Sequence, residues 1–190
     1  MGAIKLLVAF SPWIAFWIIA GGHSPLRLKI GIFVAAAMIA VMGITRLHRG
    51  VILWAGVAFF SFALVAVLWL MNVWVIHHLG ILTSATLFVA TFFSMLIGRP
   101  FTEDYARDHV PIELWNHPNF IRGCYTVTTA WGLIFLANTL VNVSALFYPQ
   151  RGEWFFRCIE LGIIAAGIAF TTVYSEQAKR KRAAGEYPIT

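Results

Sequence analysis

The chain has 190 residues, of which 60% are hydrophobic and only 12% are charged, and its mean hydropathy is +0.79. Soluble domains carry roughly 25% charged residues, so this composition excludes an ordinary soluble protein and predicts an integral membrane protein. The net charge of +6 comes from basic residues at the ends of apolar runs. Such residues anchor and orient membrane helices, so we expect no nucleic-acid partner.

The apolar runs, taken in chain order, predict an all-α bundle of six transmembrane helices over residues 1–175. The bilayer's hydrocarbon core is about 30 Å thick and takes roughly 20 apolar residues per helix. Residues 72–80, which contain two adjacent histidines, are expected to form a turn. The expected spans are residues 3–20, 30–45, 51–71, 81–98, 124–148 and 154–174.

The lysines and arginines divide unequally between the two faces of this six-span topology. The first face holds ten of them: Lys5, Arg46, Arg49, Arg99, Arg107, Arg122, Lys179, Arg180, Lys181 and Arg182. The opposite face holds four: Arg27, Lys29, Arg151 and Arg157. Because basic residues accumulate on the cytoplasmic side of membrane proteins, both termini are predicted to be cytoplasmic.

The polar stretch at residues 99–123 is predicted to be an interfacial amphipathic segment between the fourth and fifth spans. Pro100 ends the preceding helix, and Thr102 is placed to cap a short new one. Aromatic residues interleaved with charges favour the headgroup region. A solvated connecting loop is the alternative. The residues singled out here are Arg99, Pro100, Glu103, Asp104, Arg107 and Trp115.

The last residues, 176–190, are predicted to be a basic cytoplasmic tail. Four successive cations, Lys179, Arg180, Lys181 and Arg182, lie in this tail. Cations near a membrane surface attract anionic lipids, at roughly 1 kcal/mol each. The tail is therefore expected to contact membrane lipids or a protein partner.

Few polar side chains fall inside the predicted spans. Glu160 lies in the sixth span, with Arg157 three residues earlier on the same helical face. The two either form a structural ion pair, or Glu160 binds a proton or a cation, as intramembrane carboxylates often do. Asn138 and Asn142 share a face of the fifth span. They either hydrogen-bond between helices or line a polar pathway.

The sequence contains no motif that indicates a metal, a cofactor or a catalytic centre. Adjacent residues on a helix point about 100° apart, so His77 and His78 do not suit one metal site. Small residues spaced by four in several spans favour close helix packing and a possible homo-oligomer. We therefore expect a protein without catalytic activity.

Several marks from residue 99 onward resemble the bacterial intracellular septation protein A family of multi-pass inner-membrane proteins. Arg99-Pro100 opens a segment that contains Trp115, and Trp131, Phe135 and Asn142 follow in the spacing W-x3-F-x6-N. Phe156-Arg157 then opens the last span. The resemblance implies a location in the bacterial inner membrane and a role in septation or envelope integrity through protein partners.

Three functions follow as hypotheses. The first, which agrees with the resemblance, is a non-catalytic scaffold or assembly factor of the cell envelope. The second is a small-solute or proton-linked transporter or channel that uses Asn138, Asn142 and Glu160. The third is an accessory subunit of a larger membrane complex.

Overall fold

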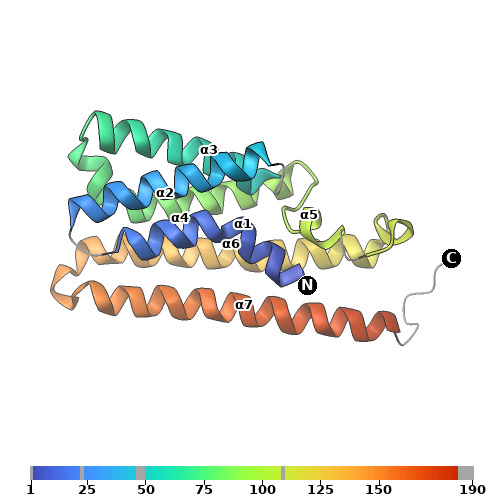
Figure 1. Ribbon diagram of the computed structural model, residues 1–190. Coiled ribbons are helices and arrows are strands. Elements are labelled where there is room, and N and C mark those ends of the chain that lie inside the picture. The colour runs from blue at the N-terminus through green and yellow to red at the C-terminus, as the bar shows by residue number, and fades with distance from the viewer. Residues whose placement is uncertain (1, 22–23, 46–49, 108–109, 184–190) are drawn as a thin grey trace.

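The computed structural model describes residues 2–21, 24–45, 50–107 and 110–183, with side chains between residues 8 and 181 of these ranges. The long helices lie side by side along one direction, and α1 begins at the end of the bundle where α7 finishes (Figure 1). Within the described ranges there is no β-strand, so the prediction of an all-α bundle is confirmed. The long helices are α1 (Gly2–Ile19), α2 (Pro25–Ile44), α3 (Val51–Ala63), α4 (Val73–Leu96), α6 (Pro118–Phe147) and α7 (Glu153–Ala183).

Short elements continue or connect these helices. The π-helix η1 (Leu64–Trp69) extends α3 without a break, and Met71 then takes a positive φ of 46° where the chain turns into α4. The helix α5 (Glu103–Ala106) and the 3-10 turn η3 (Ile112–Leu114) lie between α4 and α6. A second 3-10 turn, η4 (Pro149–Arg151), connects α6 to α7.

Five stretches of helix are long and apolar enough to cross a membrane. They are Pro25–Ile44, Val51–Trp69, Val73–Leu96, Pro118–Phe147 and Glu153–Lys181. The apolar part described for α1 is shorter, Val8–Ile19. The chain therefore has the helices of a multi-pass membrane protein, while a sixth crossing by α1 stays a prediction.

Two helices begin earlier than the apolar runs indicated. The helix α2 starts at Pro25 instead of residue 30, because proline suits the first helical turn, where its missing N–H is not needed. The helix α4 starts at Val73 instead of residue 81, and the Asn72 side chain caps it by accepting a hydrogen bond of 3.1 Å from the Val75 N–H. The expected turn at residues 72–80 is therefore wrong, and His77 and His78 are helical.

The last two long helices also extend beyond the predicted spans. The helix α6 starts at Pro118, after a His117 cap, instead of residue 124. The helix α7 runs from Glu153 to Ala183, so the backbone of Lys179, Arg180, Lys181 and Arg182 continues the helix and forms no separate tail. Helix formers with long side chains extend an existing helix readily, even where they are charged. Residues 184–190 of the expected tail lie outside the described residues.

The segment after α4 folds back into the end of the bundle instead of lying flat beside it. Pro100, Phe101 and Thr102 are buried, and the Phe101 N–H donates to Ser94 Oγ over 3.1 Å. Thr102 occupies the cap position but makes no cap hydrogen bond. Its hydroxyl instead donates to the Cys124 carbonyl over 2.8 Å, and it lies 2.7 Å from the hydroxyl of Thr128. The predicted segment 99–123 is thus partly a docked connection and, from Pro118, part of α6.

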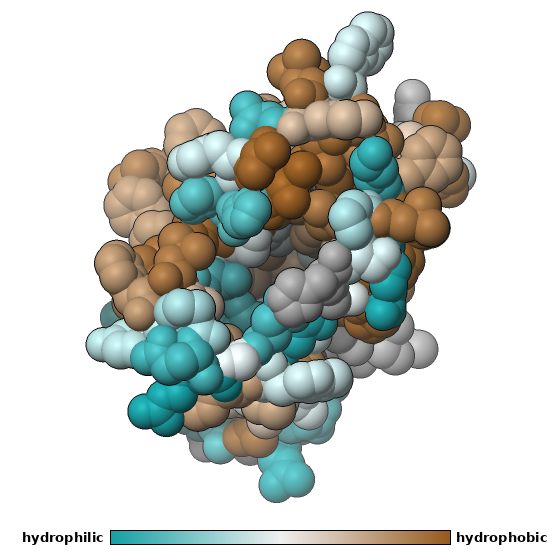
Figure 2. Space-filling model, turned by 90° about the vertical axis from the view of Figure 1, so that its left-hand side faces the viewer, coloured by the Kyte–Doolittle hydropathy of each residue, from teal (hydrophilic) through white to brown (hydrophobic). Residues whose placement is uncertain are grey.

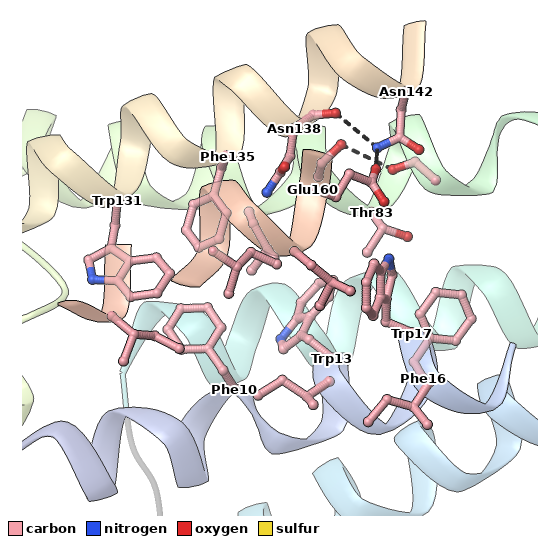
Figure 3. A pocket seen from close by; sticks show the side chains of 18 of the residues that line it. Phe10, Trp13, Phe16, Trp17, Thr83, Trp131, Phe135, Asn138, Asn142 and Glu160 are labelled. Atoms are coloured by element: carbon pink, nitrogen blue, oxygen red, sulfur yellow. Dashed lines mark hydrogen bonds between the residues drawn. The ribbon is translucent and has the colours of Figure 1, made fainter. Parts of the chain in front are cut away.

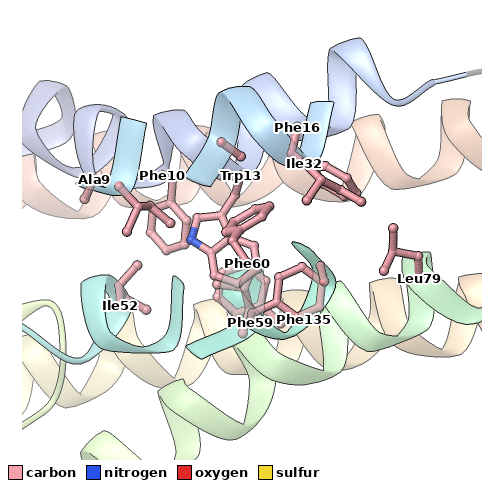
Figure 4. Packing of buried hydrophobic residues seen from close by; sticks show 14 of the residues in the cluster. Ala9, Phe10, Trp13, Phe16, Ile32, Ile52, Phe59, Phe60, Leu79 and Phe135 are labelled. Carbon is pink, nitrogen blue, oxygen red and sulfur yellow. The ribbon is translucent and has the colours of Figure 1, made fainter. Parts of the chain in front are cut away.

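The hydrophobic core centres on aromatic residues of α1 and α3 (Figure 4). Trp13 contacts the rings of Phe59 and Phe60 at centroid distances of 5.3 and 5.0 Å. One turn earlier on α1, Phe10 stacks on Trp131 of α6 at 5.6 Å. This helix therefore lies between the α2–α3 side of the bundle and the α6–α7 side (Figure 1).

Candidate functional site

A cavity of about 340 Å³ lies between α1, α4, α6 and α7 (Figure 3). Four α6 residues that line it, Trp131, Phe135, Asn138 and Asn142, are spaced by four, three and four, which puts them on one helical face. Residues 131 to 142 span roughly 16 Å at the 1.5 Å rise of a helix. The cavity is therefore elongated along the helices and lies among the membrane-spanning elements.

The polar groups gather at one end of this cavity. Trp131 and Phe10 lie at the other end, whereas Asn142, Glu160 and Trp17 face one another at the polar end (Figure 3). Each of these three residues lies within about two turns of the end of its helix. Figure 2 looks onto this end of the bundle, where hydrophobic and hydrophilic side chains border a hollow near the middle.

Among the described residues, Glu160 is the acidic residue that is buried, and 7% of its surface is exposed. The Asn142 side-chain amide donates a hydrogen bond to Glu160 Oε1. The indole nitrogen of Trp17 also faces the carboxylate (Figure 3). Burying a carboxylate in apolar surroundings is costly, and these donors offset part of that cost.

Arg157 does not form the direct ion pair with Glu160 that their spacing predicted. Within the described part of the chain, the side-chain ion pairs are Arg107–Glu103 and Lys179–Glu176. The guanidinium of Arg157 instead lies over the Trp17 ring, 5.9 Å from the ring centroid, and acts on the carboxylate through its charge. It also packs against the backbone of Gly21, where a Cβ would lie 2.2 Å from the guanidinium.

The two asparagines of α6 both belong to the cavity. Asn142 donates to the Asn138 carbonyl over 2.9 Å as well as to Glu160. It also lies against α4, because a Cβ on Gly80 would be 2.3 Å from its amide oxygen. Asn138 is 6% exposed, and its side-chain oxygen has no hydrogen-bond partner among the described residues. The structure thus brings together Asn138, Asn142 and Glu160, the three residues of the transport hypothesis.

Aromatic rings form most of the remaining wall. Phe10 packs on Phe135 at a centroid distance of 5.7 Å, and Trp131 packs on Phe135 at 5.6 Å. Trp13 and Trp17 extend this aromatic wall along α1 towards the polar end. The cavity therefore combines a long apolar body with a short polar end, which is the shape of an amphiphilic ligand.

The border of the cavity reaches the surface of the bundle between α1 and α7. Ile14 and Ile18 of α1 line the cavity, yet 40% and 63% of their surfaces are exposed. Leu161 of α7 also lines it and is 49% exposed. Side chains that are both lining and exposed mark a lateral opening, and in a membrane this opening faces lipid.

The remaining sequence-predicted residues lie away from this cavity. Arg107 pairs with Glu103 and lies over the Trp115 ring at 5.0 Å, so three residues of the polar segment join locally. Arg99 and Asp104 are exposed, and Asp104 lies beside Gly50, where a Cβ would be 2.4 Å from its carboxylate. Lys179, Arg180 and Lys181 are exposed on the last turns of α7. The side chain of Arg182 lies outside the described residues.

Several lining residues were not anticipated from the sequence. They are Phe10, Trp13 and Trp17 on α1 and Gly80 and Thr83 on α4. The spacing of Phe10, Trp13 and Trp17 puts them on one helical face, but in an apolar span this pattern equally indicates ordinary packing. Only the arrangement of the four helices shows that this face borders a cavity.

Comparisons with protein-family models, with curated proteins and with solved structures find no match for this chain. The resemblance to the septation protein A family stays a prediction drawn from the marks given above. Three of those marks, Trp131, Phe135 and Asn142, line the cavity.

Proposed function

We propose that this protein binds a small amphiphilic molecule in the cavity and carries it as a small-solute transporter of the membrane. The observation that supports this most is the meeting of Glu160, Asn138 and Asn142 at one end of an aromatic cavity. Buried polar groups in membrane helices are costly and usually serve binding or transport. Buried polar atoms normally have a hydrogen-bond partner, so a purely structural role does not explain the unpartnered amide oxygen of Asn138.

In this mechanism the apolar body of the ligand enters from the lipid between α1 and α7. It packs against the rings of Phe10, Trp13 and Phe135, while its polar head reaches Glu160 and the asparagines. Glu160 neutralises the charge of the head group or takes up a proton when the site is empty. No catalytic chemistry is required.

The topology that goes with this proposal is a bacterial inner-membrane protein with six crossings and cytoplasmic termini. Among described residues, Arg99, Arg107 and Arg122 belong to the end of the bundle where α7 finishes. Arg27 and Arg151 belong to the opposite end, where the polar part of the cavity lies. By the positive-inside rule, the polar end then faces outward.

Filling the cavity tests this proposal. In lipid nanodiscs, the full chain is expected to bind small aromatic amphiphiles in equilibrium dialysis, and Leu87→Trp should abolish this binding because Leu87 lines the cavity. The matched control is Leu133→Trp, at an α6 position that is 61% exposed. In proteoliposomes, the wild type and the control should take up the bound compound and Leu87→Trp should not. Equal binding by both variants would refute the proposal.

The exposed surface of α7 favours a second role, as a scaffold or accessory subunit in the cell envelope. Only 11% of the apolar stretch of α7 is buried against the rest of the chain, compared with 39% for α3 and η1. Gly162 and Ala166 lie on this exposed surface, and small residues let a partner helix approach closely. A protein partner in septation or envelope assembly, or a second copy of the chain, would pack there.

Site-specific photocrosslinking in native membranes tests the second role. A crosslinker at Ala166 should capture one protein in constant proportion, whereas a crosslinker at the lipid-facing Leu133 should capture none. Capture of the same mixture from both positions, or of lipid alone from Ala166, would exclude the α7 surface as an assembly interface.

A further inference from the structure

Several hydrogen-bond donors around the cavity are engaged by the protein itself, although the Asn138 amide N–H groups and the Trp13 indole N–H have no hydrogen bond among the described residues. The hydroxyls of Thr83 and Ser84 donate to carbonyls of their own helix over 2.6 and 3.0 Å. Thr171 does the same over 2.9 Å, and it accepts from the Trp131 indole N–H over 3.0 Å. The Asn142 amide donates to Asn138 and Glu160. These groups have little left to donate to a ligand.

Acceptors, in contrast, remain available at the polar end. The Asn138 side-chain oxygen has no partner among the described residues, but it has almost no accessible surface, so the Glu160 carboxylate is the main acceptor for a ligand. A carboxylate accepts about four hydrogen bonds, so the donor from Asn142 leaves capacity on Glu160. The hydroxyl oxygens of Thr83 and Ser84 also keep lone pairs after donating. A molecule that supplies donors can therefore satisfy the Glu160 carboxylate.

The electrostatics of the cavity favour a positive charge on that molecule. Among the described lining residues, Glu160 is the acidic side chain and none is basic. The rings of Trp13, Trp17 and Phe135 present π-electron faces, which attract cations. The guanidinium of Arg157 lies over the Trp17 ring and makes no direct ion pair with the carboxylate.

We infer that the ligand's head group is an ammonium that carries N–H donors, attached to a small aromatic or aliphatic body. Its N–H groups donate to the Glu160 carboxylate. A quaternary ammonium lacks these donors, and a carboxylate is repelled by Glu160. The inference rests on the proposed function, because it names the substrate class of the same cavity.

A matched series of four compounds tests the inference on the full chain in lipid nanodiscs. The compounds share a phenethyl-type body and differ in the head group: phenethylammonium, phenethyltrimethylammonium, phenethyl alcohol and hydrocinnamate. Phenethylammonium is expected to bind about tenfold or more tightly than the other three, the effect of roughly one additional charged hydrogen bond. Tighter or equal binding of the quaternary compound or of the carboxylate would overturn the inference.

One variant separates the head-group assignment from the cavity itself. Glu160→Gln should weaken phenethylammonium about tenfold and leave phenethyl alcohol nearly unchanged, which also shows that the variant is folded. The control is Glu176→Gln, at an exposed position on the same helix. Loss of both compounds in equal measure would overturn the head-group assignment. Binding of all four compounds that Leu87→Trp leaves unchanged would refute the proposed function as well.

Discussion

At the scale of single residues, Asn138 is the clearest case of a side chain that lowers stability and is better explained by function. Its amide oxygen is buried and without a partner among the described residues. A buried polar atom left unsatisfied costs about 1–3 kcal/mol, and an apolar residue of the same shape avoids that cost. Such a conflict is typical of a binding site, where a ligand supplies the missing partner.

The first prediction concerns the stability of the Asn138→Leu variant. Without ligand, its free energy of unfolding should rise by about 1 kcal/mol, because the unsatisfied amide is removed and the Asn138 carbonyl still accepts from Asn142. Thermal unfolding in detergent measures the change. Asn119→Leu, at an exposed position of α6, is the matched control and should shift the midpoint little. A destabilised Asn138→Leu variant would contradict this account of the amide.

Other residue-scale predictions from the sequence fared unequally. The shared face of Asn138 and Asn142 follows from helical spacing and is confirmed, since both line the cavity. The pairing of Glu160 with Arg157 is wrong, because Asn142 of the neighbouring helix donates to the carboxylate instead. Spacing along one helix shows which side chains are neighbours on its surface, but it does not include donors from another helix.

At the scale of elements, hydroxyl groups hold the segment after α4 in place. Thr102 Oγ1 donates to the Cys124 carbonyl and lies beside the hydroxyl of Thr128, and the Ser94 hydroxyl accepts from the Phe101 N–H. Phe101 also packs edge-on against Phe10 of α1 at 6.1 Å. The segment thereby joins α1, α4 and α6 at the end of the bundle opposite the polar end of the cavity.

The second prediction is that Thr102→Val loosens this segment. The change keeps the side-chain shape but leaves the Thr128 hydroxyl without its Thr102 partner, so it should lower stability by about 1 kcal/mol. Cleavage by trypsin after Arg107 should become faster. Thr126→Val is the control, because Thr126 is exposed and its hydroxyl donates within its own helix. Unchanged cleavage in Thr102→Val would show that apolar packing alone holds the segment.

The third prediction concerns alkaline pH and Tyr105 of α5. Burial raises the pKa of the Tyr105 hydroxyl above its usual value, and the Asp104 carboxylate adds to the effect. Below about pH 10 the hydroxyl is neutral in both the folded and the unfolded chain, so it causes no pH dependence there. Above that pH the unfolded chain loses the proton more readily, and the free energy of unfolding falls.

The measurement is the thermal midpoint as the pH rises above about 10. In Tyr105→Phe the thermal midpoint should fall less as the pH rises, because this change removes the group that ionises preferentially in the unfolded chain. Tyr148→Phe, at a residue 54% exposed, should follow the wild-type curve. A Tyr105→Phe curve that falls as steeply as the wild type would exclude the buried hydroxyl as the cause.

At the scale of the whole molecule, the alternating direction of the long helices puts the start of α1 and the end of α7 at the same end (Figure 1). If all six long elements cross the membrane, both termini then lie on one side. The helices α6 and α7 are the longest, and α1 is the element whose crossing is not established by length. The topology therefore depends on α1.

The fourth prediction uses single cysteines on a Cys124→Ser, Cys158→Ser background to test the topology. A membrane-impermeant maleimide should label Gln150→Cys in intact spheroplasts. It should label Gly2→Cys and Gln177→Cys only after the membrane is opened. Labelling of Gly2→Cys from outside would mean that α1 does not cross, and labelling of Gln177→Cys from outside would reverse the orientation.

The sequence by itself determined the class of the protein and the approximate place of its helices. Long apolar runs bury their backbone hydrogen bonds within each helix, so composition and length are enough to predict membrane-spanning helices. The Asn72 cap of α4 and Pro118 at the first position of α6 mark where these helices begin, although apolar run length alone placed those starts too late.

Only the tertiary structure decided what the polar residues do. Glu160, Asn142 and Trp17 come from three helices, and their meeting depends on how those helices pack. The free acceptor of Asn138 and the cavity beside it follow from the same packing. Helices in a membrane associate through shape and hydrogen bonding between side chains distant in the chain, and the apolar pattern of each helix alone carries little of that information.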